Sequence, residues 1–349
     1  MFPVLSPAWK FLFCCIAILM SASAIVAAQD CPLCSQSGVF VQPFRFADAK
    51  IEVAPPVTPA MPANDGEQGW VMRKLVNEVT VLFSVTNKGK FVDDLALQDI
   101  EVRDDKKPPS AILDFRSEVD LPLRLGLLID TSDSVTERFD FEKKAATKFL
   151  QQVIRRNMDR AFVMGFNSRT QVTQDFTDDP ELLQNGVSRL KDGGSTAVYD
   201  AVIRACEKLA REGETGTVAR VLVLLTDGDD TASHRTYAAA MDAAQRMGVT
   251  VFGVSTNNID HSLPGDVKLK GLADESGGRT IFPGEANDLP KAFSKVEKEI
   301  RSRYAVSYRP ASFELNGHYR KIKIEARKLG KKLRVHARSG YYARLEPVN

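Results

Sequence analysis

Three oxygen-bearing side chains alternate directly after an apolar segment of the chain. The nearly unbroken apolar run Leu123–Ile129 is followed by Asp130, Ser132 and Ser134. A run of this kind predicts a strand that is buried on both faces. Oxygen side chains at i, i+2 and i+4 of a turn can converge on one point, and hard divalent cations prefer such oxygen ligands. The stretch therefore predicts a cation site at the end of a buried strand.

Two later loops could complete this site. Thr196 follows the pair Gly193-Gly194, whose lack of side chains allows close backbone approach, and it precedes a predicted helix. Asp227 follows a second apolar strand, as Asp130 follows the first. Ligands of open α/β sheets bind beyond the carboxyl ends of the strands, so both loops are expected at the same sheet edge.

Each motif taken alone also fits an ordinary structural role. Ser134-Val135-Thr136-Glu137 fits a helix capping box, and Thr226-Asp227-Gly228 fits a simple turn. Asp229 and Asp230 are expected to be solvated neighbours that strengthen the local negative field, and Asp133 to be exposed. Asp200 is expected to be a surface or helix-start residue and not a ligand.

Catalysis is disfavoured because its usual motifs are missing. A phosphatase of the haloacid dehalogenase type would need a second Asp two residues after Asp130, where the sequence has Ser132. The sequence has no Walker A loop, GxSxG elbow or HExxH motif, and its four histidines are scattered. We therefore expect that the chain is not an enzyme.

The elements around the site alternate between strand and helix. Apolar runs predict strands at 123–130, 161–166, 171–174, 220–226, 250–255 and 279–282, and helical patterns lie at 137–155, 180–191, 197–211, 236–247, 267–275 and 286–303. This alternation predicts an α/β fold with a doubly wound, mostly parallel sheet. Period-two patterns before and after it, at 74–115 and 304–338, predict a smaller all-β sandwich into which the α/β domain is inserted.

The remaining segments suggest export. Residues 1–28 have one charged side chain, Lys10, and an apolar stretch that ends in small residues, as in a cleaved secretory signal, although an uncleaved membrane anchor is the alternative. We thus predict a signal peptide at 1–28, a proline-rich tether at 29–73, β segments at 74–120 and 304–349, and the α/β domain at 121–303.

Cys31 and Cys34 are expected to form a local disulfide, and Cys206 to be buried in a helix.

The charge distribution argues against nucleic acid as a partner. The 349-residue chain has a formal net charge of only +2. Lys and Arg outnumber Asp and Glu between Lys291 and Arg344, and this segment could bind anionic lipid, polysaccharide or nucleic acid, or contact an anionic envelope surface. However, the alternation in Lys321–Arg327 and Lys332–Arg338 places most of these charges on one strand face, so we expect a solvated outer face.

The three motifs together resemble a von Willebrand factor A (VWA) domain with a complete metal-ion-dependent adhesion site. The resemblance rests on DxSxS at 130–134, Thr196 after a glycine pair, and the TDG sequence after the strand at 220–226, and it covers residues 121–303. The flanks resemble a bacterial exported family of these proteins, with a charged turn at Val102–Lys107 and a GYY sequence near the end, at Gly340–Tyr342.

The resemblance implies a Rossmann-like fold and a metal-dependent binding function. Mg²⁺, or Mn²⁺ or Ca²⁺ in its place, would be contacted by Ser132, Ser134 and Thr196 and would interact with Asp130 and Asp227 mainly through water. A protein partner that presents Asp or Glu would fill the remaining coordination position. The expected function is an exported, non-catalytic binding or adhesion protein; the alternatives are an envelope assembly module whose metal only stabilises the fold, and a metal-dependent phosphatase-like hydrolase.

Overall fold

The computed structural model describes residues 78–117, 121–212, 218–257, 263–312, 314 and 316–343. The predicted signal peptide, the proline-rich tether and the cysteine pair Cys31 and Cys34 lie outside the described residues. Among the described residues, no helix is both long and apolar enough to cross a membrane.

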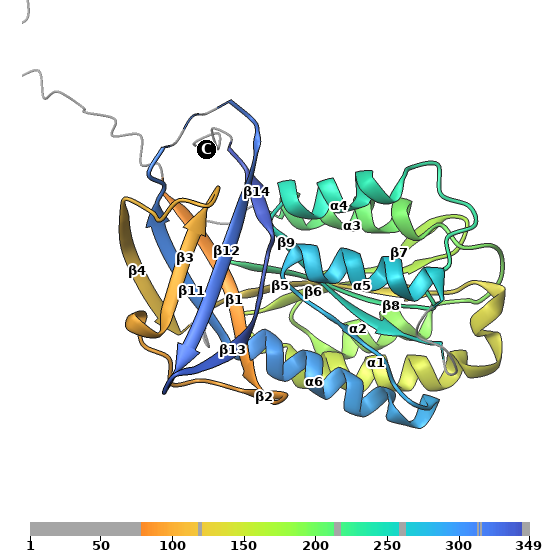
Figure 1. Ribbon diagram of the computed structural model, residues 1–349. Helices are drawn as coiled ribbons and strands as arrows, with labels where there is room; N and C mark the ends of the chain where they lie inside the picture. Colours follow the sequence, from red (N-terminus) through yellow and green to blue (C-terminus); the bar gives the residue numbers. More distant parts are fainter. Residues whose placement is uncertain are drawn as a thin grey trace, which may run out of the picture. The chain divides into compact units, whose positions relative to one another are not determined.

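A six-stranded sheet forms the centre of the α/β part (Figure 1). Its order is β10-β9-β8-β5-β6-β7, and all neighbouring strands are parallel except β7, which runs antiparallel to β6. The prediction of a mostly parallel, doubly wound sheet is confirmed. The strands are β5 (Leu123–Asp130), β6 (Arg160–Phe166), β7 (Thr170–Thr177), β8 (Ala219–Thr226), β9 (Val249–Ser255) and β10 (Thr280–Ile281).

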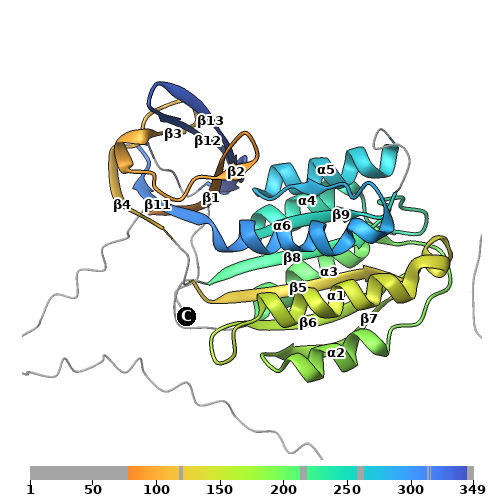
Figure 2. The same cartoon turned by 90° about the horizontal axis from the view of Figure 1, so that it is seen from below.

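Helices cover both faces of this sheet (Figure 2). One apolar core joins the sheet to α1 (Phe139–Val153), α2 (Pro180–Ser188) and α6 (Leu289–Arg301). The other core joins it to α3 (Val198–Arg211), α4 (Tyr237–Arg246) and α5 (Pro264–Ser276). All eight residues of β5 are buried, as expected for a central strand of a parallel sheet that is covered on both sides.

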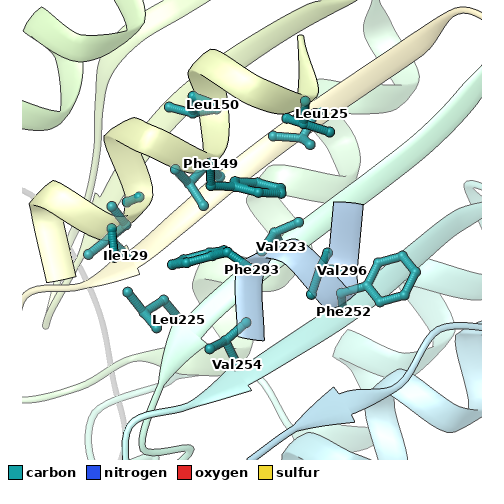
Figure 3. Packing of buried hydrophobic residues seen from close by; sticks show 14 of the residues in the cluster. Leu125, Ile129, Phe149, Leu150, Val223, Leu225, Phe252, Val254, Phe293 and Val296 are labelled. Atoms are coloured by element: carbon teal, nitrogen blue, oxygen red, sulfur yellow. The ribbon is translucent and has the colours of Figure 1, made fainter. Parts of the chain in front are cut away.

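The first core is close-packed around two stacked rings. Phe149 of α1 and Phe293 of α6 lie 4.9 Å apart between ring centroids, in the same core as Leu125 and Ile129 of β5 (Figure 3). Each of these side chains is at most 4% exposed, and full burial of such a side chain stabilises the fold by roughly 1.5–3 kcal/mol. This packing fixes β5, and with it the position of the turn that follows.

The segments before and after the α/β part share a second, antiparallel sheet of eight strands with its own core. The chain leaves this sheet after β4 and returns as β11, which lies between β4 and β1. The predicted pairing of the two flanking segments is therefore confirmed. The strands are β1 (Val79–Asn87), β2 (Lys90–Phe91), β3 (Ile100–Asp104), β4 (Ala111–Ser117), β11 (Arg303–Arg309), β12 (Tyr319–Lys328), β13 (Lys331–Ala337) and β14 (Gly340–Tyr342).

The two layers of this flanking part are joined by one strand. The first half of β13 pairs with β12, whereas its second half pairs with β1. A strand that passes between layers forms a corner of a sandwich and makes the sheet continuous, which the period-two pattern alone does not reveal. Ile322 and Ile324 face the core, while Lys321 and Lys323 are exposed, which confirms the expected solvated outer face.

Several element ends differ from the predictions. A 3₁₀-helix (Asp133–Arg138) precedes α1, and its N-cap is Ser132, so the predicted capping box at Ser134 does not form. The last long helix begins at Leu289, after a short 3₁₀-helix (Ala286–Asp288), because Pro290 favours the first turn of an α-helix. A further 3₁₀-helix (Leu97–Asp99) precedes β3.

Candidate metal centre

The candidate site lies where β5 and β8 end. The two strands are parallel neighbours in which Ile129 pairs with Leu225, so Asp130 and Thr226 extend to the same edge. After β5 the chain continues to β6 on one side and later to β8 on the other, so this edge is a switch point of the strand order. Such switch points are where α/β sheets bind ligands.

Asp130 is fully buried and hydrogen-bonded through both carboxylate oxygens. Oδ2 accepts from Thr226 Oγ1 at 2.6 Å, and Oδ1 accepts from the Ser132 amide at 2.9 Å. Burial raises the pKa of Asp130; the hydrogen bonds from Thr226 and Ser132 oppose this effect, and the nearby Asp227 charge adds to it. Two carboxylates at a buried edge are an arrangement that a bound cation stabilises.

Side-chain hydrogen bonds connect the two serines to Asp227. Ser132 Oγ and Ser134 Oγ lie 3.1 Å apart, and Ser134 Oγ donates to Asp227 Oδ2 at 2.9 Å. Asp227 is held in turn by the Asp229 amide, which donates to its Oδ1, and by Asn257, which donates to its carbonyl oxygen at 2.9 Å. The structure thus brings together four of the five predicted residues, Asp130, Ser132, Ser134 and Asp227.

Thr196 belongs to a loop that is fastened to the same turn through its backbone. The Asp133 amide donates to the Gly194 carbonyl at 3.0 Å, and the Gly194 amide donates to Asp133 Oδ1 at 2.9 Å. Gly194 has φ +96°, a conformation that favours glycine, which explains the glycine in this loop. Thr196 itself is buried, and within the described ranges no hydrogen bond joins its hydroxyl to the other four side chains.

Four positioning residues went unrecognised in the sequence. Asp133 is exposed as expected, but its carboxylate accepts from the Gly194 amide and so holds the loop of Thr196. Thr226 donates to the carboxylate of Asp130, and Asn257 donates to the carbonyl oxygen of Asp227. Asp230, expected to be a solvated neighbour, instead accepts from the Val198 amide at 2.7 Å at the start of α3. Side-chain oxygens commonly satisfy the free amides of a first helical turn, but Asp230 lies 32 residues after Val198, so no local pattern in the sequence indicates this contact.

The glycine of the TDG turn allows close contact with α5. Gly228 has φ +83°, and a Cβ at this position would lie 2.5 Å from the carbonyl oxygen of Gly265. Any larger residue would push α5 away from the strand end that carries Asp227. The glycine is therefore required by packing as well as by backbone conformation.

A buried ion pair lies at the start of α1, near the site. Glu142 is fully buried, and its Oε1 accepts from Arg138 Nε at 3.1 Å, while Arg138 also donates to Thr256 Oγ1. Burial raises the pKa of Glu142 to about 8; Arg138 opposes this effect, and the charges of Asp130 and Asp227 add to it. The negative field of the two aspartates therefore reaches this carboxyl group.

The donor set fits a hard divalent cation. Across the described residues, no group of three or more His, Cys, Asp or Glu side chains is placed to hold a metal. The candidate site instead combines the two carboxylates of Asp130 and Asp227 with three hydroxyl residues. Oxygen ligands of this kind suit Mg²⁺, Mn²⁺ or Ca²⁺ better than the softer metals that Cys and His favour.

Comparison with known proteins assigns this part of the chain to a family model. Residues 125–295 match the von Willebrand factor type A domain. No curated protein matches the chain.

Several solved structures are similar to part of the chain. The PilB minor pilin from Streptococcus sanguinis is 14% identical with a TM-score of 0.44, over 56% of this chain and 63% of the pilin. An aerotolerance-related membrane protein from Bacteroides fragilis is 16% identical with a TM-score of 0.42, over 51% of this chain and 98% of that chain. Proximal thread matrix protein 1 from the mussel byssus, with a zinc-occupied MIDAS motif, is 16% identical with a TM-score of 0.45, over 56% of this chain and 49% of that chain. The matched region thus spans less than two-thirds of the pilin and about half of the mussel protein.

Proposed function

We propose that this chain is a non-catalytic protein that binds a protein partner through a divalent cation, a proposal supported by the match of residues 125–295 to the von Willebrand factor type A domain. The cation would be held by Asp130, Ser132, Ser134, Thr196 and Asp227. The observation that supports this proposal best is the hydrogen-bonded chain from Ser132 through Ser134 to Asp227, beside the buried Asp130.

The mixture of charged and neutral ligands explains what the cation would do. Only two of the five side chains carry a negative charge, so the bound ion would keep part of its positive charge and could attract an Asp or Glu carboxylate of the partner. Ser134 is exposed to solvent, whereas Asp130 is not, so a partner would approach from the side of the serine turn. Mg²⁺ is the cation that we favour because it commonly combines few protein ligands with exchangeable water.

The flanking sheet would present this site to the partner. In this proposal, segments 74–120 and 304–349 form a support for the domain at 121–303, and the tether at 29–73 separates both from the signal peptide at 1–28. The protein would then act in the periplasm or outside the cell, or at the membrane if the signal is not cleaved.

Chelation separates this function from a purely structural metal. The tagged full-length chain is used to capture proteins from an extract of the exporting cells in Mg²⁺ and in EDTA, while circular dichroism follows the fold. We expect capture of a specific protein in Mg²⁺ only, with an unchanged spectrum in EDTA. Unfolding in EDTA would favour the structural metal, and capture that does not depend on Mg²⁺ would contradict the proposal.

Two serine variants provide the matched control for this experiment. Ser134→Ala removes one proposed ligand, and Ser168→Ala removes an exposed serine from the β6–β7 loop. We expect only the first variant to lose capture. Hydrolysis of a generic phosphoester by the wild type, lost in the Ser134 variant, would favour the hydrolase alternative instead.

A further inference from the structure

A pocket separate from the metal centre lies over the outer face of β3 and β12. It encloses about 540 Å³, within the range of small-molecule sites. Its lining includes four cationic side chains, Arg103, Lys106, Lys321 and Lys323, together with the aromatic ring of Tyr319. A pocket with this lining combines positive charge with apolar surface.

Two of the four cations already have a carboxylate partner. Arg103 and Lys323 are paired residues of the β3–β12 ladder. Each forms an ion pair along its own strand: Arg103 with Glu101 at 2.6 Å, and Lys323 with Glu325 at 2.8 Å. Lys106 and Lys321, in contrast, form no ion pair within the described part of the chain. The unbalanced positive charge of the pocket therefore lies on these two lysines.

The turn that carries Lys106 is rigidly attached to Lys321. Asp104 and Lys107 exchange two backbone hydrogen bonds around Asp105 and Lys106, which both have positive φ, +47° and +69°. The Asp105 amide donates to the Lys321 carbonyl oxygen at 2.8 Å, and Asp105 Oδ1 accepts from the Lys321 amide at 2.9 Å. The residue before Lys106 is thus bonded to the backbone of Lys321, and both lysines line the same pocket.

The conformation of Lys106 is unusual for its residue type. Tight turns with two positive φ angles favour Asn or Asp followed by Gly, because a side chain in this conformation is strained. The chain places a lysine where glycine would be favoured, and this lysine lines the pocket. Strained residues of this kind often serve a binding role.

The apolar part of the pocket is also held in place. Tyr319 Oη lies 2.8 Å from Ser339 Oγ and accepts from Gln245 of α4 at 3.1 Å, so its ring is fixed. Ser339 also bonds to Glu275 of α5, which brings one carboxylate to the pocket. The α/β part therefore contributes Glu275 to the lining of the pocket, and its Gln245 helps to hold Tyr319 in place.

We propose that this pocket binds a small organic phosphate, with the phosphate group between Lys106 and Lys321 and the apolar part of the ligand against Tyr319. A doubly charged phosphate matches two adjacent unpaired lysines better than a single carboxylate does. The nearby Arg103 provides a further cation, although it is shared with Glu101. The site is independent of the metal centre and of the proposed partner.

Calorimetric titration of the full-length chain with phenyl phosphate at low ionic strength tests this site. We expect saturable binding that weakens as salt is added, at least tenfold tighter than that of inorganic phosphate or of phenol. The double variant Lys106→Gln/Lys321→Gln should weaken binding at least tenfold. The control Lys90→Gln/Lys331→Gln removes the same charge from exposed strand ends of the same sheet and should leave binding unchanged.

A second variant predicts a change in the opposite direction. Glu275→Gln keeps an acceptor for Ser339 but removes the negative charge, so it should tighten phenyl phosphate binding several-fold. Equal affinity of the wild type and the double lysine variant, or no binding of phenyl phosphate, would overturn the proposal. Binding to phosphatidylglycerol vesicles without binding of free phenyl phosphate would overturn it as well, because the basic face would then be a lipid-contacting surface.

Discussion

The buried carboxyl group of Glu142 should make the stability of the protein depend on pH in a predictable way. Burial raises its pKa from 4.5 to about 8, against the opposing effect of Arg138. Since the folded state then binds more protons than the unfolded chain between these two values, the free energy of unfolding falls as pH rises through this interval. The contribution of this group is most favourable below pH 4.5 and reaches its minimum above pH 8.

The size of the effect follows from the two pKa values. Each pH unit inside the interval changes the free energy of unfolding by about 1.4 kcal/mol. Between pH 5 and 7 this group should therefore reduce stability by roughly 2.5 kcal/mol, with roughly another 1.4 kcal/mol between pH 7 and 9. Glu142→Gln imitates the neutral carboxyl group and should remove this part of the pH dependence.

The assay is urea unfolding of the wild type and Glu142→Gln in EDTA at pH 5, 7 and 9. The difference between the two proteins isolates Glu142, because all other groups titrate in both. The variant should gain stability relative to the wild type at each step up in pH. Glu137→Gln, at an exposed position of the preceding turn, is the control and should follow the wild type.

A flat difference between wild type and Glu142→Gln from pH 5 to 9 would refute this reasoning. It would mean that the ionised carboxylate is as stable in the folded protein as in water. A difference of the opposite sign would show that the ion pair with Arg138 dominates over burial.

Three further predictions concern packing and buried polar groups. Gly228→Ala should reduce stability by about 2 kcal/mol or more in urea unfolding, because its Cβ would meet the Gly265 backbone; a loss below about 0.5 kcal/mol would contradict the proposed contact. Tyr308→Phe removes the hydrogen bond to buried Asp104 at 3.0 Å and should cost roughly 1–3 kcal/mol, whereas an unchanged midpoint would show that this bond contributes nothing. Cys206 should resist thiol reagents at pH 8 until the protein unfolds, because burial raises its pKa to about 12; labelling of this cysteine in the folded chain, mapped by mass spectrometry, would contradict its burial.

The strand–helix pattern was sufficient to predict most of the fold. Buried strands such as β5 and β8 are apolar throughout, and this composition is directly visible in the sequence. The antiparallel direction of β7 was not predictable, because period and composition do not specify strand direction. The passage of β13 between two layers was missed for a similar reason, since it depends on which neighbour each half of the strand meets.

Buried charges were the least predictable feature of the helices. Glu142 and Glu299 look like ordinary polar positions in the sequence, yet both are fully buried. Glu299 accepts from Ser84 Oγ at 2.8 Å and pairs with Arg279, which come from distant parts of the chain. The partners of Glu299 are remote in sequence, so no local pattern reveals its burial, whereas the partner of Glu142, Arg138, lies only four residues before it.

The residues of the candidate site were easier to predict than their supports. Asp130 and Asp227 each follow an apolar strand, a position that the sequence marks clearly. Asp230 and Thr226 act on other residues through hydrogen bonds that depend on the fold. Residue type and spacing thus marked the proposed ligand positions, but not the groups that hold them in place.

Calorimetric titration of Mg²⁺ into the chelator-treated protein tests the cation site most directly. Ser134→Ala is the informative variant because Ser134 is exposed, so its loss should leave the fold intact, and Ser168→Ala is its control. We predict that the wild type and the control bind one Mg²⁺ with the same affinity and that Ser134→Ala binds it at least tenfold more weakly. Equal affinity of all three proteins, or no binding of Mg²⁺, Mn²⁺ or Ca²⁺ by the wild type, would contradict a cation site formed by Asp130, Ser132, Ser134, Thr196 and Asp227.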